Sequence, residues 1–485
     1  MSCVTEEVRF EEDGGHPPLE YIFHPQSIAV VGASPNPRKR GHEYMKWLLD
    51  YGYRGKLYPV NRRSGDVLGL RAYPSLADIP GPVDHVISCI PAYQVSQLIQ
   101  ECVAKGVKVI QLHTAGFSET GDEAKAKLEL EAVNIARNAG IRVIGPNCMG
   151  LHYPRMSLAF GANSSQPHWK ESGPVGYFSQ SGGNASELLN RASIRGIRFS
   201  KVISYGNACD LNEGDFLEYF SQDPETEIIC AYLEGVRDGR RFVAALKQAT
   251  SLKPVIILKG GRTEAGTRAV SSHTGSLAGS NQLWDALCRQ VGAIRVYDLE
   301  EMADLVLAFL FLTPPQGRRV GVIGMGGGAS VQSADDCTVE GLHVPPFPDD
   351  VRQELRRFTP EAGTSIRNPV EGQMVRSPDL REIIRIVEDY QDVDLLMFNI
   401  NVDFSSGKLG QGTEFSGVID TLIGAKEASS KPWAVVLRSA GARESLDAIE
   451  EGQSRCWEAG IPVYYTMAHA ARAISTFIHY HEMRA

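Results

Sequence analysis

The sequence has 485 residues, enough for about three domains of ordinary size. Its apolar share of 43% and its charged share of 22% are typical of a soluble globular protein. The net charge of −9 is spread along the chain. This argues against a nucleic-acid surface, because phosphate binding along a backbone needs clustered lysine and arginine.

The nine cysteines are scattered and none forms a Cys-x-x-Cys pair, so the sequence predicts neither disulfides nor a zinc site, and no other metal site. Residues 1–20 form an acidic, polar N-terminal extension, unlike a signal peptide. The most apolar run, residues 305–312, is too short to span a bilayer. We therefore expect a cytoplasmic protein.

Apolar runs typical of strands alternate with helical patterns, which predicts α/β domains with parallel sheets. The first runs cover residues 27–31 and 56–61, and later ones end at residues 89–91, 112–116 and 143–147. Each run ends in small or turn-forming residues. In open α/β sheets, ligands bind at the carboxyl ends of the strands.

The turn after the first strand, residues 32–34, lacks the second and third glycines of a dinucleotide fingerprint. The second strand ends in Asn61-Arg62-Arg63 instead of Asp or Glu, and Lys39 and Arg40 lie at the start of the first helix, where an anion is favoured. This suits a nucleotide with an extra phosphate, such as CoA or, less well, NADP. A plain strand-to-helix turn with solvated charges is the alternative. The expected CoA contacts are Gly32, Ala33, Ser34, Lys39, Arg40, Asn61, Arg62, Pro91, Thr114, Ala115, Gly116 and Asn147.

The rest of the chain contains an internal repeat. The pattern of Val175, Gly182 and Gly196 aligns without gaps on that of Val320, Gly327 and Gly341, and each copy continues with a Lys-Pro strand and a Val-Tyr pair. A duplicated flavodoxin-like domain explains this pattern, with residues 313–317 as the linker. The first copy has an insertion, residues 260–279, whose Ser-Ser-His-Thr-Gly-Ser segment the second copy lacks.

The segment around Ser179 leads from a strand into a helix start made of small residues, whose N–H groups and hydroxyls could hold a phosphate. A hydrolase nucleophile at Ser181 is a weaker interpretation, because Ser179 stands where the first glycine of a nucleophile elbow belongs. Simple helix capping by Ser179 or Ser181 is the remaining alternative.

His273 lies in a segment so rich in glycine, serine, threonine and alanine that it cannot form a core. Small residues allow a loop to move and a phosphate to approach backbone amides. Neutral imidazole is a nucleophile near pH 7, and it needs a carboxylate on its other nitrogen for orientation. Glu234, at the end of the apolar run 228–233, suits that role. A solvated surface histidine and a strand-end carboxylate in water are the alternatives.

Together these residues resemble the alpha subunit of ADP-forming acetyl-CoA and acyl-CoA synthetases, in the succinyl-CoA synthetase superfamily. The resemblance covers nearly the whole chain from about Phe23, and its most specific part is residues 271–279, which are similar to the family's phosphohistidine loop. Residues 145–148, 179–182 and 234–236, and Gly206-Asn207 with Asp210, resemble further family motifs.

The resemblance implies a relay in which acyl-CoA and phosphate give an acyl phosphate, which phosphorylates His273, and the phosphoryl group then passes to ADP. It implies His273 and Glu234 as catalytic residues. The implied phosphate-binding residues are Ser179, Gln180, Ser181, Gly182, Ser272, Thr274 and Gly275. No segment resembles an ATP-grasp domain, so the family implies a partner beta subunit that binds ATP or ADP with Mg²⁺, in a hetero-oligomer.

We therefore expect a Rossmann-like CoA-binding domain over residues 21–155 and two flavodoxin-like, succinyl-CoA-ligase-type domains over residues 165–312 and 318–485. The predicted function is acid–thiol ligation through phosphohistidine. The rival hypotheses are a catalytically silent CoA-binding scaffold, against which His273 and Glu234 both argue, and an NADP-dependent oxidoreductase.

Overall fold

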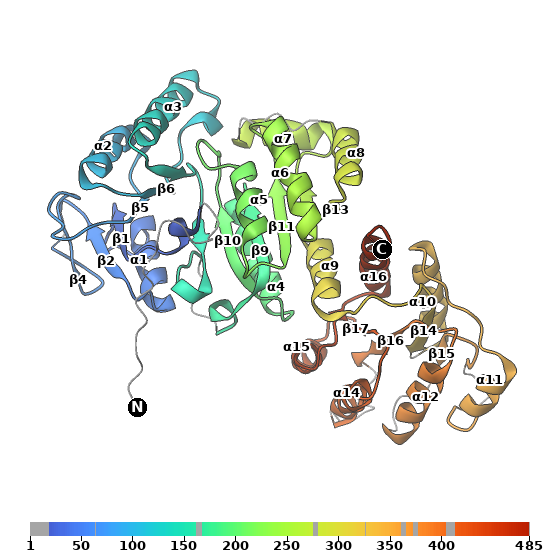
Figure 1. Cartoon of the computed structure of the whole chain (residues 1–485). Coiled ribbons are helices and arrows are strands. Elements are labelled where there is room, and N and C mark those ends of the chain that lie inside the picture. The colour runs from blue at the N-terminus through green and yellow to red at the C-terminus, as the bar shows by residue number, and fades with distance from the viewer. Residues whose placement is uncertain are drawn as a thin grey trace. The chain divides into compact units, whose positions relative to one another are not determined.

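The computed structural model describes residues 19–63, 65–161, 167–274, 280–324, 326–359, 365–371, 377–403 and 413–484 (Figure 1). The chain forms two compact units. One holds the residues up to Ser186 together with Phe199–Arg295, and the other holds Glu187–Arg198 and Val296–Ala485. In the described part of the chain no helix is long and apolar enough to cross a membrane.

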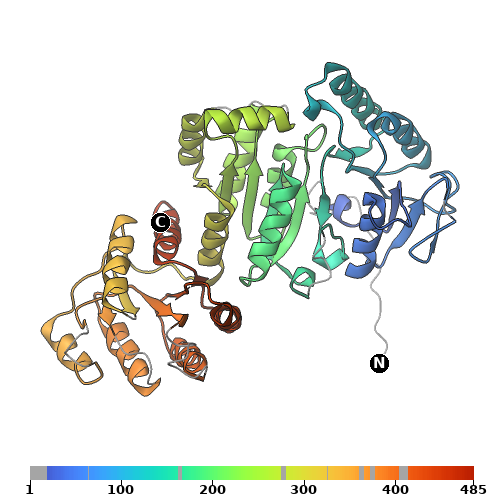
Figure 2. The same ribbon diagram turned by 180° about the vertical axis from the view of Figure 1, so that it is seen from behind.

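The first sheet has the strand order β2-β1-β5-β6-β7, all parallel. Its strands are β1 (Ser27–Val31), β2 (Lys56–Val60), β5 (His85–Ser88), β6 (Val109–Leu112) and β7 (Arg142–Ile144). Helix α1 (Arg40–Tyr51) lies on one face of this sheet, and helices α2 (Val95–Lys105) and α3 (Glu123–Asn138) lie on the other (Figures 1 and 2). The faces differ because the chain adds strands on one side of β1 through α1 and on the other side through α2 and α3, and such crossovers are right-handed. A small ribbon, β3 (Asp66–Val67) with β4 (Leu70–Arg71), lies beside β2.

The second sheet has the order β13-β12-β11-β9-β10-β8; β9 to β12 are parallel, and β8 pairs antiparallel with β10. The strands are β8 (Gly150–His152), β9 (Ser172–Ser179), β10 (Phe199–Ser204), β11 (Ile228–Leu233), β12 (Val255–Lys259) and β13 (Ile294–Val296). The connecting helices are α4 (Gly182–Ser193), α5 (Glu213–Gln222), α6 (Gly239–Leu252), α7 (Glu264–Thr274) and α8 (Asn281–Val291), and α9 (Leu299–Phe311) follows β13.

The third sheet has the order β15-β14-β16-β17-β18, all parallel. The strands are β14 (Val320–Gly324), β15 (Val370–Glu371), β16 (Leu395–Asn401), β17 (Trp433–Arg438) and β18 (Val463–Tyr464). Helices α10 (Gly327–Val339) and α16 (Met467–Glu482) pack together, as do α11 (Asp349–Leu355), α12 (Ser377–Asp389), α14 (Thr413–Lys426) and α15 (Arg443–Glu458) in turn. Short 3₁₀ helices elsewhere are η1 (Glu20–Phe23), η2 (Ala92–Gln94), η3 (Ser118–Thr120), η4 (Pro154–Met156) and η5 (Pro167–Lys170).

All three sheets share one arrangement. If five strands of each sheet are numbered along the chain, leaving out β8, the order is 2-1-3-4-5, the flavodoxin-like doubly wound order, with β8 added at one edge of the second sheet. This confirms the expected α/β class and the duplication. The copies differ after the fourth strand: α7, residues 275–279 and α8 lie between β12 and β13, whereas α15 alone joins β17 to β18. The exact domain boundaries stay predictions.

Candidate active site

The turn after β1 is built by two glycines in close contact. Gly32 has a φ of +89°, and a Cβ on it would lie 2.8 Å from the Cys89 carbonyl oxygen. A Cβ on Gly41, in the first turn of α1, would lie 2.0 Å from the Gly32 carbonyl oxygen. Helix α1 therefore rests directly on the backbone of the turn, which any larger side chain at Gly41 would push away. Asn61 fixes the other side of the turn, since its Nδ2 donates to the Ala33 carbonyl at 2.5 Å.

The basic groups expected at this turn are exposed at its rim. Lys39 is the N-cap residue of α1, and Lys39, Arg40 and Arg62 are all exposed to solvent. The Arg40 guanidinium is partly neutralised by Glu43, at 2.7 Å. The helix N-terminus adds partial positive charge to that of Lys39 and Arg62. The rim suits a phosphate group on a bound nucleotide.

The other predicted CoA contacts differ in how accessible they are. Pro91 and Ala115 are exposed, but Thr114 is buried and its hydroxyl donates to the Ile90 carbonyl at 2.8 Å. The Gly116 N–H donates to the Glu119 carboxylate at 2.5 Å, so this amide already has an anionic partner. Asn147 is partly exposed, with a φ of +58°.

The turn between β9 and α4 is held by its own serines. Ser179 is fully buried, and its Oγ donates to the Ser181 carbonyl at 2.7 Å and accepts from the Ser181 N–H at 3.1 Å. Ser181 Oγ accepts from the Asn184 N–H at 3.3 Å, which is helix capping. Ser181, Gly182 and Gly183 are at least partly exposed, so the N-terminus of α4, where an anion is favoured, is accessible to solvent.

Gln180 and Lys259 hold Glu234 in place. The buried Gln180 side chain turns inward, and its Oε1 accepts from the N–H groups of Glu234 and Gly235, the latter at 2.9 Å. Lys259, the last residue of β12, donates to the Glu234 carbonyl at 2.8 Å, and burial lowers the pKa of its ammonium to about 8. The Tyr232 hydroxyl donates to Glu234 Oε1 at 3.2 Å, and Glu234 is only 4% exposed. The carboxylate thus sits at the end of β11, beside the α4 turn.

The position of His273 differs from the expected loop. Helix α7 runs to Thr274, so the backbone of residues 271–274 forms its last turn. The side chains of Ser272, His273 and Thr274, and residues 275–279 with Gly275, lie outside the described residues. The helix extends this far because Glu264, Ala265, Arg268 and Ala269, good helix formers, precede the Gly/Ser/Thr-rich run.

A polar network joins the first two sheets inside the same unit. Asp210 accepts from Arg137 at 2.7 Å, from Arg142 at 3.0 Å and from the Val143 N–H at 2.8 Å. Asn207 Nδ2 donates to Glu119 at 2.6 Å. The sequence indicated Asn207 and Asp210 but gave no sign of their partners. Sequence reasoning also missed two residues of the site that the sequence could have indicated. Lys259 ends an apolar strand just before two glycines, and Gly41 follows Gly32 at the start of the first helix.

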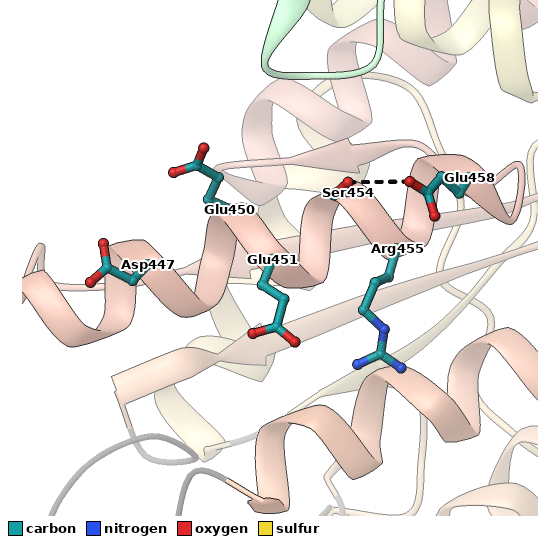
Figure 3. A pocket seen from close by; sticks show the side chains of 6 residues that line it. All are labelled: Asp447, Glu450, Glu451, Ser454, Arg455 and Glu458. Carbon is teal, nitrogen blue, oxygen red and sulfur yellow. Dashed lines mark hydrogen bonds between the residues drawn. The ribbon is translucent and has the colours of Figure 1, made fainter. Parts of the chain in front are cut away.

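Between β17 and β18, a stretch that the structure describes throughout, there is no counterpart of the histidine segment. The helix in this stretch, α15, presents Asp447, Glu450, Glu451, Ser454, Arg455 and Glu458 along a surface pocket (Figure 3). Four of these six side chains are carboxylates, which repel phosphate. We therefore assign no phosphate or CoA site to this pocket.

Comparisons with known proteins agree with this geometry. Residues 26–154 match the CoA binding domain and residues 172–309 match the succinyl-CoA ligase like flavodoxin domain. The alpha subunits of ADP-forming acetate–CoA ligases I and II from Pyrococcus furiosus are each 40% identical, over 73% and 79% of this chain and 76% and 81% of their own. The ADP-forming acetate–CoA ligase I from Archaeoglobus fulgidus is 33% identical over 96% of this chain and 64% of its own length.

A solved structure extends the likeness to the fold. The Ca. Korarchaeum cryptofilum dinucleotide-forming acetyl-coenzyme A synthetase 1, in complex with phosphate and ADP, superimposes with a TM-score of 0.80 at 33% identity, over 96% of this chain and 97% of that chain. Sequence relatives, domain matches and fold agree, and the chain belongs to the alpha-subunit family of the ADP-forming acetate–CoA ligases.

Proposed function

We propose that this chain is the CoA-binding, phosphohistidine-carrying subunit of an NDP-forming acyl-CoA synthetase, which interconverts acyl-CoA, ADP and phosphate with carboxylate, CoA and ATP. The observation that carries the proposal is the clamp on Glu234: Gln180, from the turn before α4, and Lys259 hold the Glu234 backbone, and the Tyr232 hydroxyl donates to its carboxylate. The family relationship favours this ligase over the scaffold and the NADP oxidoreductase.

The reaction runs in three displacements. A phosphate oxygen attacks the thioester carbonyl, the C–S bond breaks, and CoA leaves with a proton. A nitrogen of His273 then attacks the phosphorus of the acyl phosphate, and the P–O bond to the carboxylate breaks. Finally an ADP oxygen takes the phosphoryl group. In this scheme Glu234 accepts a hydrogen bond from the other imidazole nitrogen and stabilises the positive charge of the ring, while Ser181 and Gly182 hold the phosphate.

The partner is proposed to be an ATP-grasp beta subunit that binds the nucleotide and its Mg²⁺. The relatives named as alpha subunits support a separate partner, and the longer Archaeoglobus relative, of which this chain spans 64%, supports a fused form elsewhere in the family. A cytoplasmic location, expected from the sequence, belongs to the same proposal.

The experiment combines the purified chain with an ATP-grasp subunit. The chain alone should bind CoA but make no ATP from ADP, phosphate and acetyl-CoA, and adding the beta subunit should give turnover. ATP synthesis by the chain alone would contradict the division of labour, and no synthesis with any ATP-grasp partner would contradict the function.

A further inference from the structure

His113 follows β6 at the carboxyl edge of the first sheet, directly before Thr114 and Gly116 of the expected CoA site. Its ring is half-buried and makes two contacts through one nitrogen. Nδ1 lies 3.0 Å from the Cys148 carbonyl oxygen and 3.1 Å from the Tyr44 hydroxyl. The Tyr44 hydroxyl in turn donates to the Met149 carbonyl at 2.9 Å.

These contacts fix the position of the proton on the ring. A carbonyl oxygen only accepts, so His113 Nδ1 must carry the hydrogen that binds Cys148. The Tyr44 proton is committed to Met149, so the Tyr44 oxygen also faces Nδ1 as an acceptor. In the neutral ring Nε2 therefore keeps its lone pair, and it is a proton acceptor held in one orientation.

The surroundings keep the ring neutral near pH 7. Burial lowers the pKa of His113, while its bond to Cys148 opposes this shift. The charged groups that face it are Arg40 and Glu43 of α1, which are paired with each other at 2.7 Å, and their effects on the ring have opposite signs. The titratable groups in contact or close by are Tyr44 and Cys148, both buried.

The ring also lies between the two expected substrate sites. Met149, next to Cys148, donates its N–H to Ser204 Oγ at 3.0 Å, and a Cβ on Gly182 would lie 2.6 Å from the Met149 side chain. The Cys148-Met149 dipeptide therefore connects His113 directly to the N-terminus of α4. A CoA held by the first sheet and an acyl phosphate at α4 would meet in this region.

We propose that His113 is the general base of the thioester-forming step, with Nε2 accepting the thiol proton of CoA. The proposal rests on the proposed function and deepens it. As the sulfur attacks the carbonyl of the acyl phosphate, the S–H bond breaks to Nε2, the C–S bond forms, and the C–O bond to the phosphate breaks. In the reverse direction the imidazolium returns the proton to the departing thiolate.

The test measures two half-reactions of the chain with its beta subunit. Labelling of the protein by radiolabelled acetyl phosphate needs no thiol, whereas acetyl-CoA formation from acetyl phosphate and CoA does. His113→Ala should label at the wild-type rate but form acetyl-CoA about 10²–10⁴-fold more slowly, since general bases contribute that much. In His113→Asn the amide nitrogen takes the place of Nδ1 and can still donate to the Cys148 carbonyl, but nothing replaces Nε2, so this variant should be as slow as His113→Ala. The exposed His343→Ala serves as the matched control, with unchanged rates.

The pH dependence of the rate distinguishes a general base from a residue with a purely structural role. The wild-type rate should be level near pH 7 and fall as acid protonates the imidazole below its ordinary pKa of about 6.5. The rate of His113→Ala should instead climb with pH as the thiol ionises by itself. Acetyl-CoA formation by His113→Ala within threefold of the wild-type rate, a wild-type rate in His113→Asn, or a loss of labelling alongside the loss of acetyl-CoA formation would each overturn the proposal. A wild-type protein that takes no label would overturn the proposed function itself.

Discussion

At the scale of single residues, the key group is Glu234. Gln180 and Lys259 hold its backbone, and Tyr232 donates to its carboxylate. Glu234→Gln keeps the size of the side chain but removes its charge. We expect the fold to survive and labelling by acyl phosphate to slow by about 10⁴-fold, as for the loss of an orienting carboxylate in a catalytic triad. Circular dichroism checks the fold. Tyr232→Phe, which removes the hydrogen bond from the Tyr232 hydroxyl to Glu234 but leaves the charge of Glu234, is the control and should label within a few-fold of wild type. An equal effect of both changes would contradict the role of the charge.

Lys39 and Arg62 carry the second residue-scale prediction. Their exposed charges at the α1 turn should bind the 3′-phosphate of CoA. Charged hydrogen bonds contribute about 1.5–3 kcal/mol each, so dephospho-CoA should bind roughly tenfold more weakly or worse. Calorimetric titration measures the affinities of CoA and dephospho-CoA, and Lys39→Ala should reduce the difference between them. Equal affinities for the two ligands would rule out this phosphate site.

The sequence predicted the residue types of the site better than their roles. Glu234 was identified because it directly follows an apolar strand, and Ser181 because it lies in the small-residue helix start after another. Gln180 was expected to touch phosphate, but its side chain faces the N–H groups of Glu234 and Gly235. The contact between Asn207 and Glu119, 88 residues apart, depends on the packing of two sheets, which no local pattern encodes.

Helix α1 gives the clearest prediction at the scale of an element. Gly41→Ala would put a Cβ 2.0 Å from the Gly32 carbonyl, so α1 must move off the turn. Overpacking of this kind typically costs about 1–3 kcal/mol, and the shift should also weaken CoA binding. Urea denaturation and CoA titration measure the two effects. Gly239→Ala is the control. Gly239 is the first residue of α6 and an added Cβ would have nothing within 4 Å, so neither stability nor CoA binding should change. Unchanged CoA binding in Gly41→Ala would show that α1 does not shape the site.

Elements with a clear apolar period were predictable from sequence, and the insertion was not. The predicted first strand, residues 27–31, coincides with β1, and the predicted second, residues 56–61, ends one residue after β2. The histidine segment was expected to be a loop because of its small residues, yet its first four residues continue α7. The helix-forming residues that precede this segment extend α7 into it. They lie too far from His273 to be noticed when only the composition around His273 is considered.

The whole molecule repeats one strand order three times, and only one copy carries the insertion with His273. The duplication of the second and third domains was visible in sequence because their glycines recur at the same spacing, but the sequence did not show that the first domain shares their strand order. The division into two compact units, with residues 187–198 in the same unit as the third sheet, was not visible, because it depends on how helix ends pack.

The central claim is that His273 carries the phosphoryl group, and radiolabelled acyl phosphate tests it most directly. The wild-type chain should acquire a phosphate that is labile in acid and stable in alkali, as a phosphoramidate is. His273→Ala should take up no label while its CoA affinity stays unchanged, because the expected CoA contacts lie on the first sheet and the insertion lies on the second. His343→Ala should label normally. Labelling of His273→Ala at the wild-type rate would show that another residue is the carrier and would contradict the account.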